Sequence, residues 1–553
     1  MNKATNKNRL LFGAPDADSD LLLKDCLIEG QVGRYSKPIL IGRWGTGKSA
    51  NLIARARTLE SVLEKVDPLS KRDWYIKEQH ISTHSLFELH KQHAESASEG
   101  YFISQIQEVW KSEINQRVIR VLALLARSES VSADVSSAHW KSVLEFGKYD
   151  FALESMWNFV DDILSIIFRK DGSKATDGFR GYYSMLRSAK IERSIQRCIL
   201  DLEAADQPVP MIGIEPIETP TSNLDSRVNM AECVIAALLN VYRNDYVIND
   251  RQRVQVFLSL PWNRTANKKI NLPQHIKPLM EEIRWTKENL RKFISRRIEW
   301  ELNGRSTTRQ FRAGLDAWDA IFPKTIENRS CDREHGSEFS FDYVLRHTQW
   351  RARDIQTVSR ECVLTHCNNE SITVGSFFRS RQTLPEKVVM DCVAKFSQDT
   401  AKLRLEEARR RFSSANQTYF EQDAISSALR GINVPMSETD LRKRLSPAGD
   451  YQRFADILNA LWESGIVGIH ISCADDKYCR VIETSYPQAK SRHVYSKNER
   501  QYFLFHYNTD KTPQHLKDGF DKETNDINLK YILHPCFFEN LECHVSNPFP
   551  LGV

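Results

Sequence analysis

Few folds can accommodate residues 37–53 of this chain, which read KPILIGRWGTGKSANLI. The central part, GRWGTGKS, fits the pattern G-x-x-x-x-G-K-[ST], with an apolar run before it and an amphipathic run after it. Glycines let backbone N–H groups curl around a polyphosphate without a Cβ clash, and a helix that begins directly after them points its positive end at the anion. The stretch therefore predicts a buried strand, a phosphate-binding loop and a helix, the start of an α/β nucleotide-binding domain with a parallel sheet.

The residue types in this loop have separate expected roles. We expect Lys48 to reach the β and γ phosphates of a bound nucleotide, and the hydroxyl of Ser49 to coordinate Mg²⁺. The backbone on either side of them is expected to surround the phosphates. The nucleotide-binding residues predicted from the loop are Gly42, Gly45, Thr46, Gly47, Lys48, Ser49 and Ala50.

A magnesium site of this kind also needs a carboxylate at the end of a neighbouring buried strand. In PVPMIGIEPIETP an apolar strand ends at Glu215, and Glu218 follows three residues later. We expect Glu215 to hold the metal and Glu218 to orient the attacking water, so that Lys48, Glu215 and Glu218 are the predicted catalytic residues and Ser49 and Glu215 the predicted metal ligands. Because Pro216 rather than an acid follows Glu215, either hydrolysis is slow or Glu218 takes the role of the catalytic acid.

Two further patterns complete the expected nucleotide domain. RVQVFLSLPWN, residues 253–263, is almost continuously apolar and predicts a central parallel strand. Ser259 and Asn263 near its end are candidates either for sensing the γ-phosphate or for a structural role. The chain between the phosphate loop and Glu215 is too long for one crossover, so a large insertion is expected at about residues 95–205. Its apolar residues recur every three and four positions, which predicts helices.

The segment after this strand reads IRWTKENLRKFISRRIEWEL. Thr286 is expected to cap a helix there, with Trp285 and Leu290 placed as a hydrophobic staple. Farther along the chain, HTQWRARDIQTV places an arginine followed by an aspartate at the start of a helix. These two segments resemble the helical lid of bacterial AAA+ and STAND-like P-loop ATPases, and the similarity extends in outline over residues 10–365.

This resemblance implies a cofactor, site residues and a setting. It implies that ATP with Mg²⁺ is bound, that Glu215 stands in place of the magnesium-linked aspartate, and that Arg353 is the lid arginine, with Arg351 as the alternative. No arginine is singled out as a trans-acting finger. Many ATPases of this kind belong to bacterial anti-phage defence systems, in which the nucleotide state controls assembly. The chain carries no nuclease or hydrolase effector motif, so a separate effector protein is the expected partner.

The C-terminal third predicts a winged-helix-like module. Three helices are expected within residues 422–466, followed by strands at residues 466–472 and 478–484 that would form the wing. The polar face of the third helix offers two acids against one arginine, which favours packing or partner docking over DNA reading. A zinc site among His534, Cys536, Cys543 and His544 is not expected, because C-x-x-C pairs and ligand-like histidine spacings are missing from this segment of the sequence.

Composition bears on the binding partners and on the cellular location. The net charge of the 553-residue chain is +5, from 77 basic and 72 acidic side chains, so no global field points to nucleic acid or to a membrane surface as partner. The eleven cysteines are scattered and odd in number, which favours reduced thiols. The polar N-terminal residues and the missing long apolar runs favour a cytoplasmic location.

We therefore expect four parts along the chain. These are a P-loop ATPase domain over residues 1–300, a helical lid over 301–395, a connector helix with the winged-helix-like module over 396–485, and a small α+β docking segment over 486–553. The expected function is a regulatory ATPase that binds and hydrolyses ATP and assembles with itself or with an effector in anti-phage defence. The alternatives are a DNA-stimulated ATPase motor and a nucleotide-binding switch with little hydrolysis.

Overall fold

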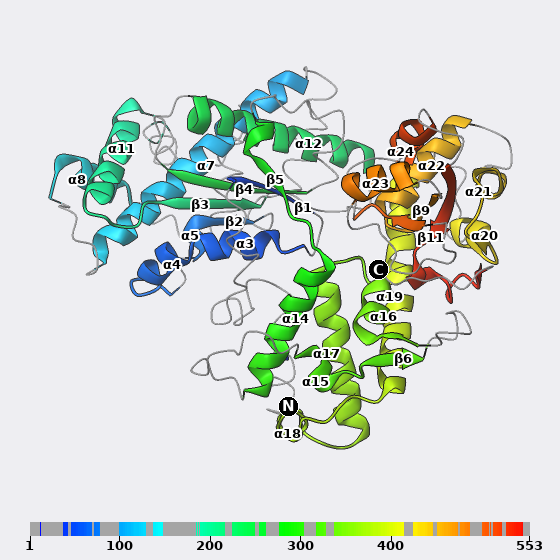
Figure 1. Cartoon of the computed structure of the whole chain (residues 1–553). Helices are drawn as coiled ribbons and strands as arrows, with labels where there is room; N and C mark the ends of the chain where they lie inside the picture. Colours follow the sequence, from blue (N-terminus) through cyan, green and yellow to red (C-terminus); the bar gives the residue numbers. More distant parts are fainter. Residues whose placement is uncertain are drawn as a thin grey trace. The chain divides into compact units, whose positions relative to one another are not determined.

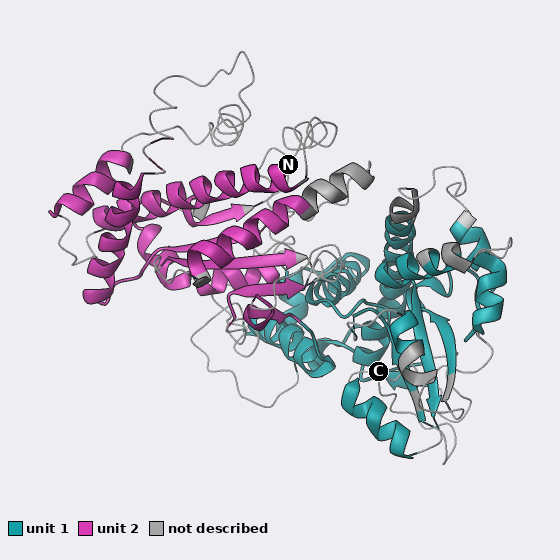
Figure 2. Cartoon of the chain, turned by 90° about the horizontal axis from the view of Figure 1, so that it is seen from above, with its two compact units in different colours: residues 1–31, 45–47, 284–553 teal, residues 32–44, 48–283 magenta. Residues whose placement is uncertain are grey.

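The computed structural model forms two compact units, which Figure 2 shows in different colours. We call residues 32–44 and 48–283 the sheet unit, and residues 1–31, 45–47 and 284–553 the C-terminal unit. The residues that the structure describes are 11–12, 37–42, 46–68, 71–77, 99–128, 136–147, 184, 186, 188–215, 224–248, 254–261, 276–303, 317–327, 337–413, 424–445, 451–473, 476–486, 500–507, 509, 513–521 and 527–545.

A five-stranded parallel sheet is the centre of the sheet unit, which confirms the expected α/β class. The spatial order is β2-β3-β4-β1-β5. β4 therefore lies between β1 and β3, so the strand that carries Glu215 is not the direct neighbour of the strand before the phosphate loop. The strands are β1 (Ile39–Gly42), β2 (Tyr75–Lys77), β3 (Met211–Glu215), β4 (Gln255–Pro261) and β5 (Met280–Glu282).

Helices lie on both faces of this sheet, as apolar parallel strands require. Figure 1 shows α3 on one face and α12 on the other. The described part of the expected insertion is helical, and Trp110 of α7 donates a hydrogen bond of 3.2 Å to the carbonyl of Val234 in α12. The helices are α3 (Lys48–Arg55), α4 (Arg57–Leu63), α5 (Lys71–Trp74), α7 (Glu99–Arg127), α8 (Ala138–Gly147), α11 (Ala189–Ala204) and α12 (Leu224–Val241), with a π-helix at Tyr242–Ile248 and a 3₁₀ turn at Lys277–Leu279.

The first part of the C-terminal unit is a group of helices that begins with α14 (Lys287–Leu302). Thr286 caps α14 by accepting a hydrogen bond from the backbone N–H of Asn289, as the sequence predicts. Leu290 and Ile298 are fully buried on one face of α14, so this helix belongs to the C-terminal unit and the expected boundary at residue 300 moves to residue 283. The other elements of this group are α15 (Trp318–Ile321), β6 (Thr325–Glu327), β7 (Ser337–Phe339), α16 (Ser340–Arg346), α17 (Ala352–Asn369) and α18 (Val374–Ser380).

The rest of the C-terminal unit contains the three predicted short helices followed by an antiparallel sheet in the order β10-β9-β11. The connector α19 (Glu386–Ser413) precedes them, and apolar side chains from the described residues as far as Cys543 pack into one core with them. The elements are α20 (Ala424–Leu429), β8 (Asn433–Val434), α21 (Glu438–Leu445), α22 (Tyr451–Glu463), β9 (Val467–Cys473), α23 (Asp476–Ser485), β10 (Arg500–Leu504), α24 (Pro513–Asp521), β11 (Ile527–Leu533), a 3₁₀ turn at Pro535–Phe537 and β12 (His544–Val545).

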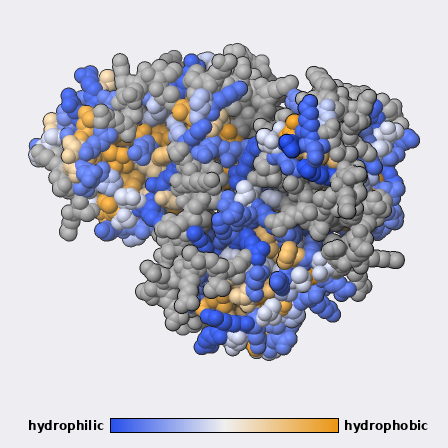
Figure 3. All heavy atoms as spheres, in the orientation of Figure 1, coloured by the Kyte–Doolittle hydropathy of each residue, from blue (hydrophilic) through white to orange (hydrophobic). Residues whose placement is uncertain are grey.

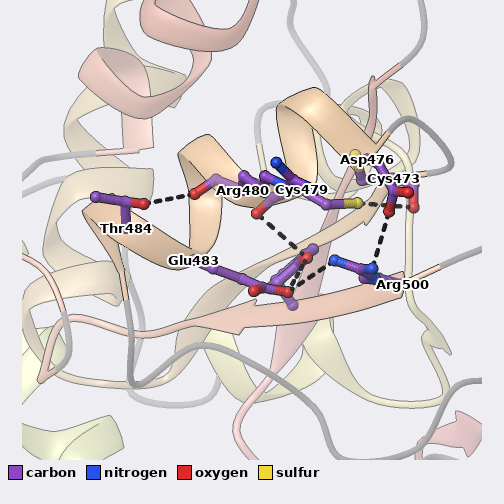
Figure 4. A network of polar contacts seen from close by, with 8 residues as sticks. Cys473, Asp476, Cys479, Arg480, Glu483, Thr484 and Arg500 are labelled. Atoms are coloured by element: carbon purple, nitrogen blue, oxygen red, sulfur yellow. Dashed lines mark hydrogen bonds and ion pairs between the residues drawn. The ribbon is translucent and has the colours of Figure 1, made fainter.

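The predicted wing is wrong in its second strand, because residues 478–484 belong to helix α23. Burial explains the difference: Cys479 and Ile482, three positions apart, are buried, whereas Val481 is 44% exposed, which is a helical and not an alternating pattern. Arg500 of β10 forms ion pairs with Asp476 at 2.8 Å and with Glu483 at 3.2 Å on this helix. Figure 4 shows this network, which fixes α23 over the sheet.

The expected docking segment from residue 486 onward contributes strands that pair with strands of the preceding module. β10 and β11 pair with the two edges of β9, and β12 pairs with β8. All seven residues of β9 are buried, so its edges need partners from elsewhere in the chain, and the C-terminal strands supply them. The side chains of Gln452, Arg453 and Asp456, on the polar face of α22 for which packing or partner docking was favoured over DNA reading, lie outside the described residues.

Figure 3 shows one face of the molecule coloured by hydropathy, and hydrophilic residues cover much of its described surface. None of the helices in the described parts of the chain is long and apolar enough to cross a membrane. Nine cysteines within those parts are thiols, and eight of the nine are buried.

Gly468 in β9 provides a test of the close contact between the strands of this sheet. A Cβ there would lie 2.8 Å from the backbone oxygen of Leu504 and press on the ring of Phe505. We expect Gly468→Ala to lower the free energy of unfolding by about 1–3 kcal/mol, measured by urea denaturation. Gly375→Ala is the control, because no atom lies within 4 Å of its added Cβ in α18 and alanine favours a helix. Equal stability of the two variants would contradict this packing.

Candidate functional site

The predicted strand and helix on either side of the loop are present in the sheet unit, where β1 ends at Gly42 and α3 begins at Lys48. Gly47 has a φ of +92°, a conformation that favours glycine, and no atom lies within 4 Å of where its Cβ would be. Lys48 is only 4% exposed, and Ala50 is also buried. Gly45 lies outside the described residues.

The carboxylate of Glu215 is the centre of the site. The hydroxyl of Ser49 donates a hydrogen bond of 2.5 Å to its Oε1, although the two residues are 166 positions apart. The hydroxyl of Ser259 donates to the same oxygen at 3.3 Å. On the other side, the phenol of Tyr75 donates to Oε2 at 2.5 Å. Both carboxylate oxygens are therefore hydrogen-bonded, by donors from α3, β4 and β2.

The register of the parallel sheet explains why these side chains meet. Ile214 of β3 lies opposite Leu258 of β4, so the next residues, Glu215 and Ser259, are neighbours at the carboxyl ends of their strands. Side chains two positions apart share a face of a strand, which places Gly213 and Glu215 on one face. Leu52 of α3 lies 3.7 Å from the Cβ position of Gly213, so α3 covers this face and brings Ser49 to the carboxylate.

Phe257 provides a second anchor for α3 on the same face of the sheet. The guanidinium of Arg55, the last residue of α3, lies 4.5 Å from the centre of the Phe257 ring. Burial lowers the pKa of Arg55, and the charge of Glu281 partly opposes this shift. A cation over an aromatic ring is stabilised by the negative ring face. The two ends of α3 are thus both fixed on the sheet, and the position of Ser49 follows.

This arrangement has the donor types of a magnesium site. A serine hydroxyl and a carboxylate oxygen are hard oxygen ligands, and Mg²⁺ commonly takes one or two such protein ligands with phosphate oxygens and water. Within the described parts of the chain, no group of three or more His, Cys, Asp and Glu side chains is arranged to hold a metal ion. An Mg²⁺ ion with Ser49 and Glu215 as protein ligands would take its other ligands from phosphate oxygens and water.

Trp285 has a role that its expected place in a hydrophobic staple did not indicate. Its indole N–H donates a hydrogen bond of 2.9 Å to the carbonyl of Thr46. Thr46 and Trp285 both belong to the C-terminal unit. The Trp285 ring packs edge-on against Phe293 of α14, with centroids 5.5 Å apart. Trp285 therefore holds the backbone of Thr46 by this hydrogen bond.

The two candidates for the lid arginine differ in their surroundings. Arg351 is buried at the N-cap of α17 and donates to the side-chain oxygen of Gln349 at 2.8 Å. Burial, with the charge of nearby Arg404, lowers the pKa of Arg351 to about 10. Arg353 in the first turn of α17 is only partly buried. Arg353 is thus the better candidate for contact with a ligand, because Arg351 is held in the interior of its unit.

The remaining residues considered in the sequence analysis are either buried in the structure or lie outside its described part. Glu218 and Asn263 lie outside the described residues. Ser259 is fully buried and donates a hydrogen bond to Glu215. His534, in the segment considered for zinc, has its ring nitrogens near the Cys536 sulfur and the Thr348 carbonyl. Tyr75 was missed by the sequence analysis, since an aromatic residue in a short buried strand is ordinarily read as core.

Comparison of the chain with models of known protein families, with curated proteins and with solved structures gives no significant match. The assignment of a function therefore depends on the geometry around the phosphate loop and Glu215.

Gly213 tests how tightly this face of the sheet is packed. A Cβ added there would lie 3.4 Å from Tyr75 and 3.6 Å from Trp74, which are ordinary contact distances. The branched methyl groups of valine would extend into both rings. We expect Gly213→Val to lower the free energy of unfolding by about 1–3 kcal/mol, and Gly213→Ala, the matched control, to change it much less. Urea denaturation checks this, and a valine variant as stable as the alanine variant would contradict it.

Proposed function

We propose that this chain binds ATP with Mg²⁺ and hydrolyses it, as a P-loop ATPase of the AAA+ or STAND-like kind. The observation that carries the proposal is the hydrogen bond of 2.5 Å between Ser49 and Glu215. These residues come from two separate motifs, each predicted to contribute one ligand to the same ion. If the glycine-rich pattern had arisen by chance, there would be no reason for a strand far away in the sequence to end with a carboxylate that accepts a hydrogen bond from Ser49.

The residues of the loop fit a nucleotide polyphosphate. The open side of Gly47 leaves room for an anion close to the backbone, and the N-terminal end of α3 supplies partial positive charge. Lys48 is nearly excluded from water, and the attraction of its ammonium group for phosphate is stronger there than at an exposed position. When bound, Mg²⁺ would be held by Ser49 and Glu215, and it would neutralise charge on the phosphates.

The hydrogen bonds of Glu215 also support separate roles for Glu215 and Glu218. Both of its oxygens already accept hydrogen bonds, which suits a fixed metal ligand and not a base that must turn toward a water molecule. We therefore propose that Glu215 holds the metal and that Glu218 orients the attacking water. Arg353 is proposed as the lid arginine that contacts the nucleotide.

The regulatory part of the proposal rests on the resemblance of the lid segments and on the composition of the C-terminal unit. That unit joins a helical group to three short helices and an antiparallel sheet, and α23 occupies the residues predicted to form the second strand of the wing. A helix held over the sheet by ion pairs suits protein docking better than insertion into a DNA groove. We propose a cytoplasmic ATPase whose nucleotide state controls assembly with itself and with a separate effector protein in bacterial anti-phage defence.

Lys48→Ala tests nucleotide binding directly. Removing the ammonium group should weaken binding of a fluorescent ATP analogue about 10- to 100-fold, the cost of losing a hydrogen bond to a charged phosphate. Fluorescence titration measures this. Lys65→Ala is the matched control, because Lys65 is an exposed lysine of the same unit. Unchanged affinity in Lys48→Ala would refute the phosphate site.

Turnover and assembly are tested by phosphate release with ATP and Mg²⁺, comparing the wild type with Glu218→Gln in the presence and absence of duplex DNA. We expect slow release that Glu218→Gln abolishes and that DNA does not change, together with a nucleotide-dependent shift in gel filtration. Stimulation by DNA would instead support the motor. Tight ATP binding without any turnover would support the switch.

A further inference from the structure

Glu215 has a hydrogen-bond partner that the glycine-rich pattern does not include. Tyr75 lies in β2, the edge strand next to β3, and its phenol donates to Oε2 of Glu215 at 2.5 Å. The side chain of Tyr75 is 3% exposed. Buried tyrosines ordinarily direct the hydroxyl to a carbonyl or to water, whereas this one meets the carboxylate that is proposed to bind the metal.

The position of the phenol is fixed from several sides. Tyr75 lies opposite Gly213 in the register of β2 and β3, so its hydroxyl reaches Glu215 two positions along the neighbouring strand. Because Gly213 has no side chain, the ring can lie against β3, 3.4 Å from where a Cβ would be. Trp74 packs beside it, with ring centroids 5.5 Å apart.

The start of β2 is anchored as well. Asp73, directly before Trp74, is 1% exposed and forms an ion pair of 2.7 Å with Arg120 of α7. Trp74 itself is fully buried. The backbone that carries Tyr75 is therefore held between α7 and the sheet.

We propose that Tyr75 is a positioning residue of the magnesium site, an inference that rests on the proposed function. The terminal torsion of a glutamate side chain has a broad range, so a carboxylate held at one oxygen can rotate. The bond from Tyr75 to Oε2 fixes that rotation and leaves Oε1 directed at Ser49. A phenol does this without adding positive charge, whereas a lysine or arginine at the same place would neutralise the carboxylate and compete with the cation.

Partners that orient a metal ligand change metal affinity 10- to 100-fold when they are removed. Tyr75→Phe keeps the ring and removes only the hydroxyl. We expect this variant to raise the Mg²⁺ concentration that half-saturates ATP turnover about 10-fold or more. We expect turnover to recover at saturating Mg²⁺, and the binding of a fluorescent ATP analogue in EDTA to stay as in the wild type. Tyr246→Phe is the control, because it removes the hydroxyl of another tyrosine in the sheet unit, which is partly buried.

Two outcomes would overturn the inference. One is an unchanged Mg²⁺ dependence in Tyr75→Phe. The other is a loss of thermal stability and of ATP binding in EDTA without a shift in Mg²⁺ dependence, which would mean that the phenol serves packing alone. Gly213→Val, which should displace the ring while leaving the hydroxyl present, must shift the Mg²⁺ dependence in the same direction.

The proposed function fails in a different way from this inference. If Lys48→Ala binds ATP like the wild type and Ser49→Ala leaves the Mg²⁺ dependence unchanged, the nucleotide site itself is refuted. If Lys48→Ala weakens ATP binding and Ser49→Ala changes the Mg²⁺ dependence, as expected, while Tyr75→Phe behaves like the wild type, only the role of Tyr75 is refuted.

Discussion

The carboxylate of Glu215 imposes the strictest requirement on the sheet unit. A charge at the carboxyl edge of a buried sheet is costly unless its oxygens are hydrogen-bonded, and here hydroxyl groups from α3, β2 and β4 do this together. Each of these elements must be in register for the carboxylate to be satisfied. The position of α3, which carries Ser49, is therefore coupled to the order of the strands.

The three donors to this carboxylate are neutral hydroxyls, which has a chemical consequence. Hydroxyls orient a carboxylate without adding a positive charge that would compete with a divalent cation for it. The positive charge of Lys48 is placed in the loop, where it suits phosphate. The buried ammonium group of Lys48 and the carboxylate of Glu215 lie at different places, an arrangement that suits a ligand with negative phosphates and a positive magnesium ion.

The C-terminal unit shows how long-range pairing changes the meaning of a local pattern. Residues 478–484 alternate in type well enough to suggest a strand, yet they form a helix because β9 finds its partners in residues 500–504 and 527–533. Once both edges of β9 are covered, the intervening chain is free to fold as α23 and to bury Cys479 and Ile482 on the sheet. The segment expected to dock as a separate module is thus a structural part of the module before it.

Short-range patterns in the chain specify the strand β1, the helix that begins at Lys48, the strand that ends at Glu215 and the cap of α14 at Thr286. Each of these depends on residues within a few positions of one another. The place of β4 between β1 and β3, the part of Tyr75 in the site and the bond of Trp285 to the loop could not be predicted in this way. These features depend on which strands pair and which faces pack, and the partners are separated by tens to hundreds of residues. Folding brings such residues together because apolar burial selects one arrangement of the whole sheet, and no local spacing records it.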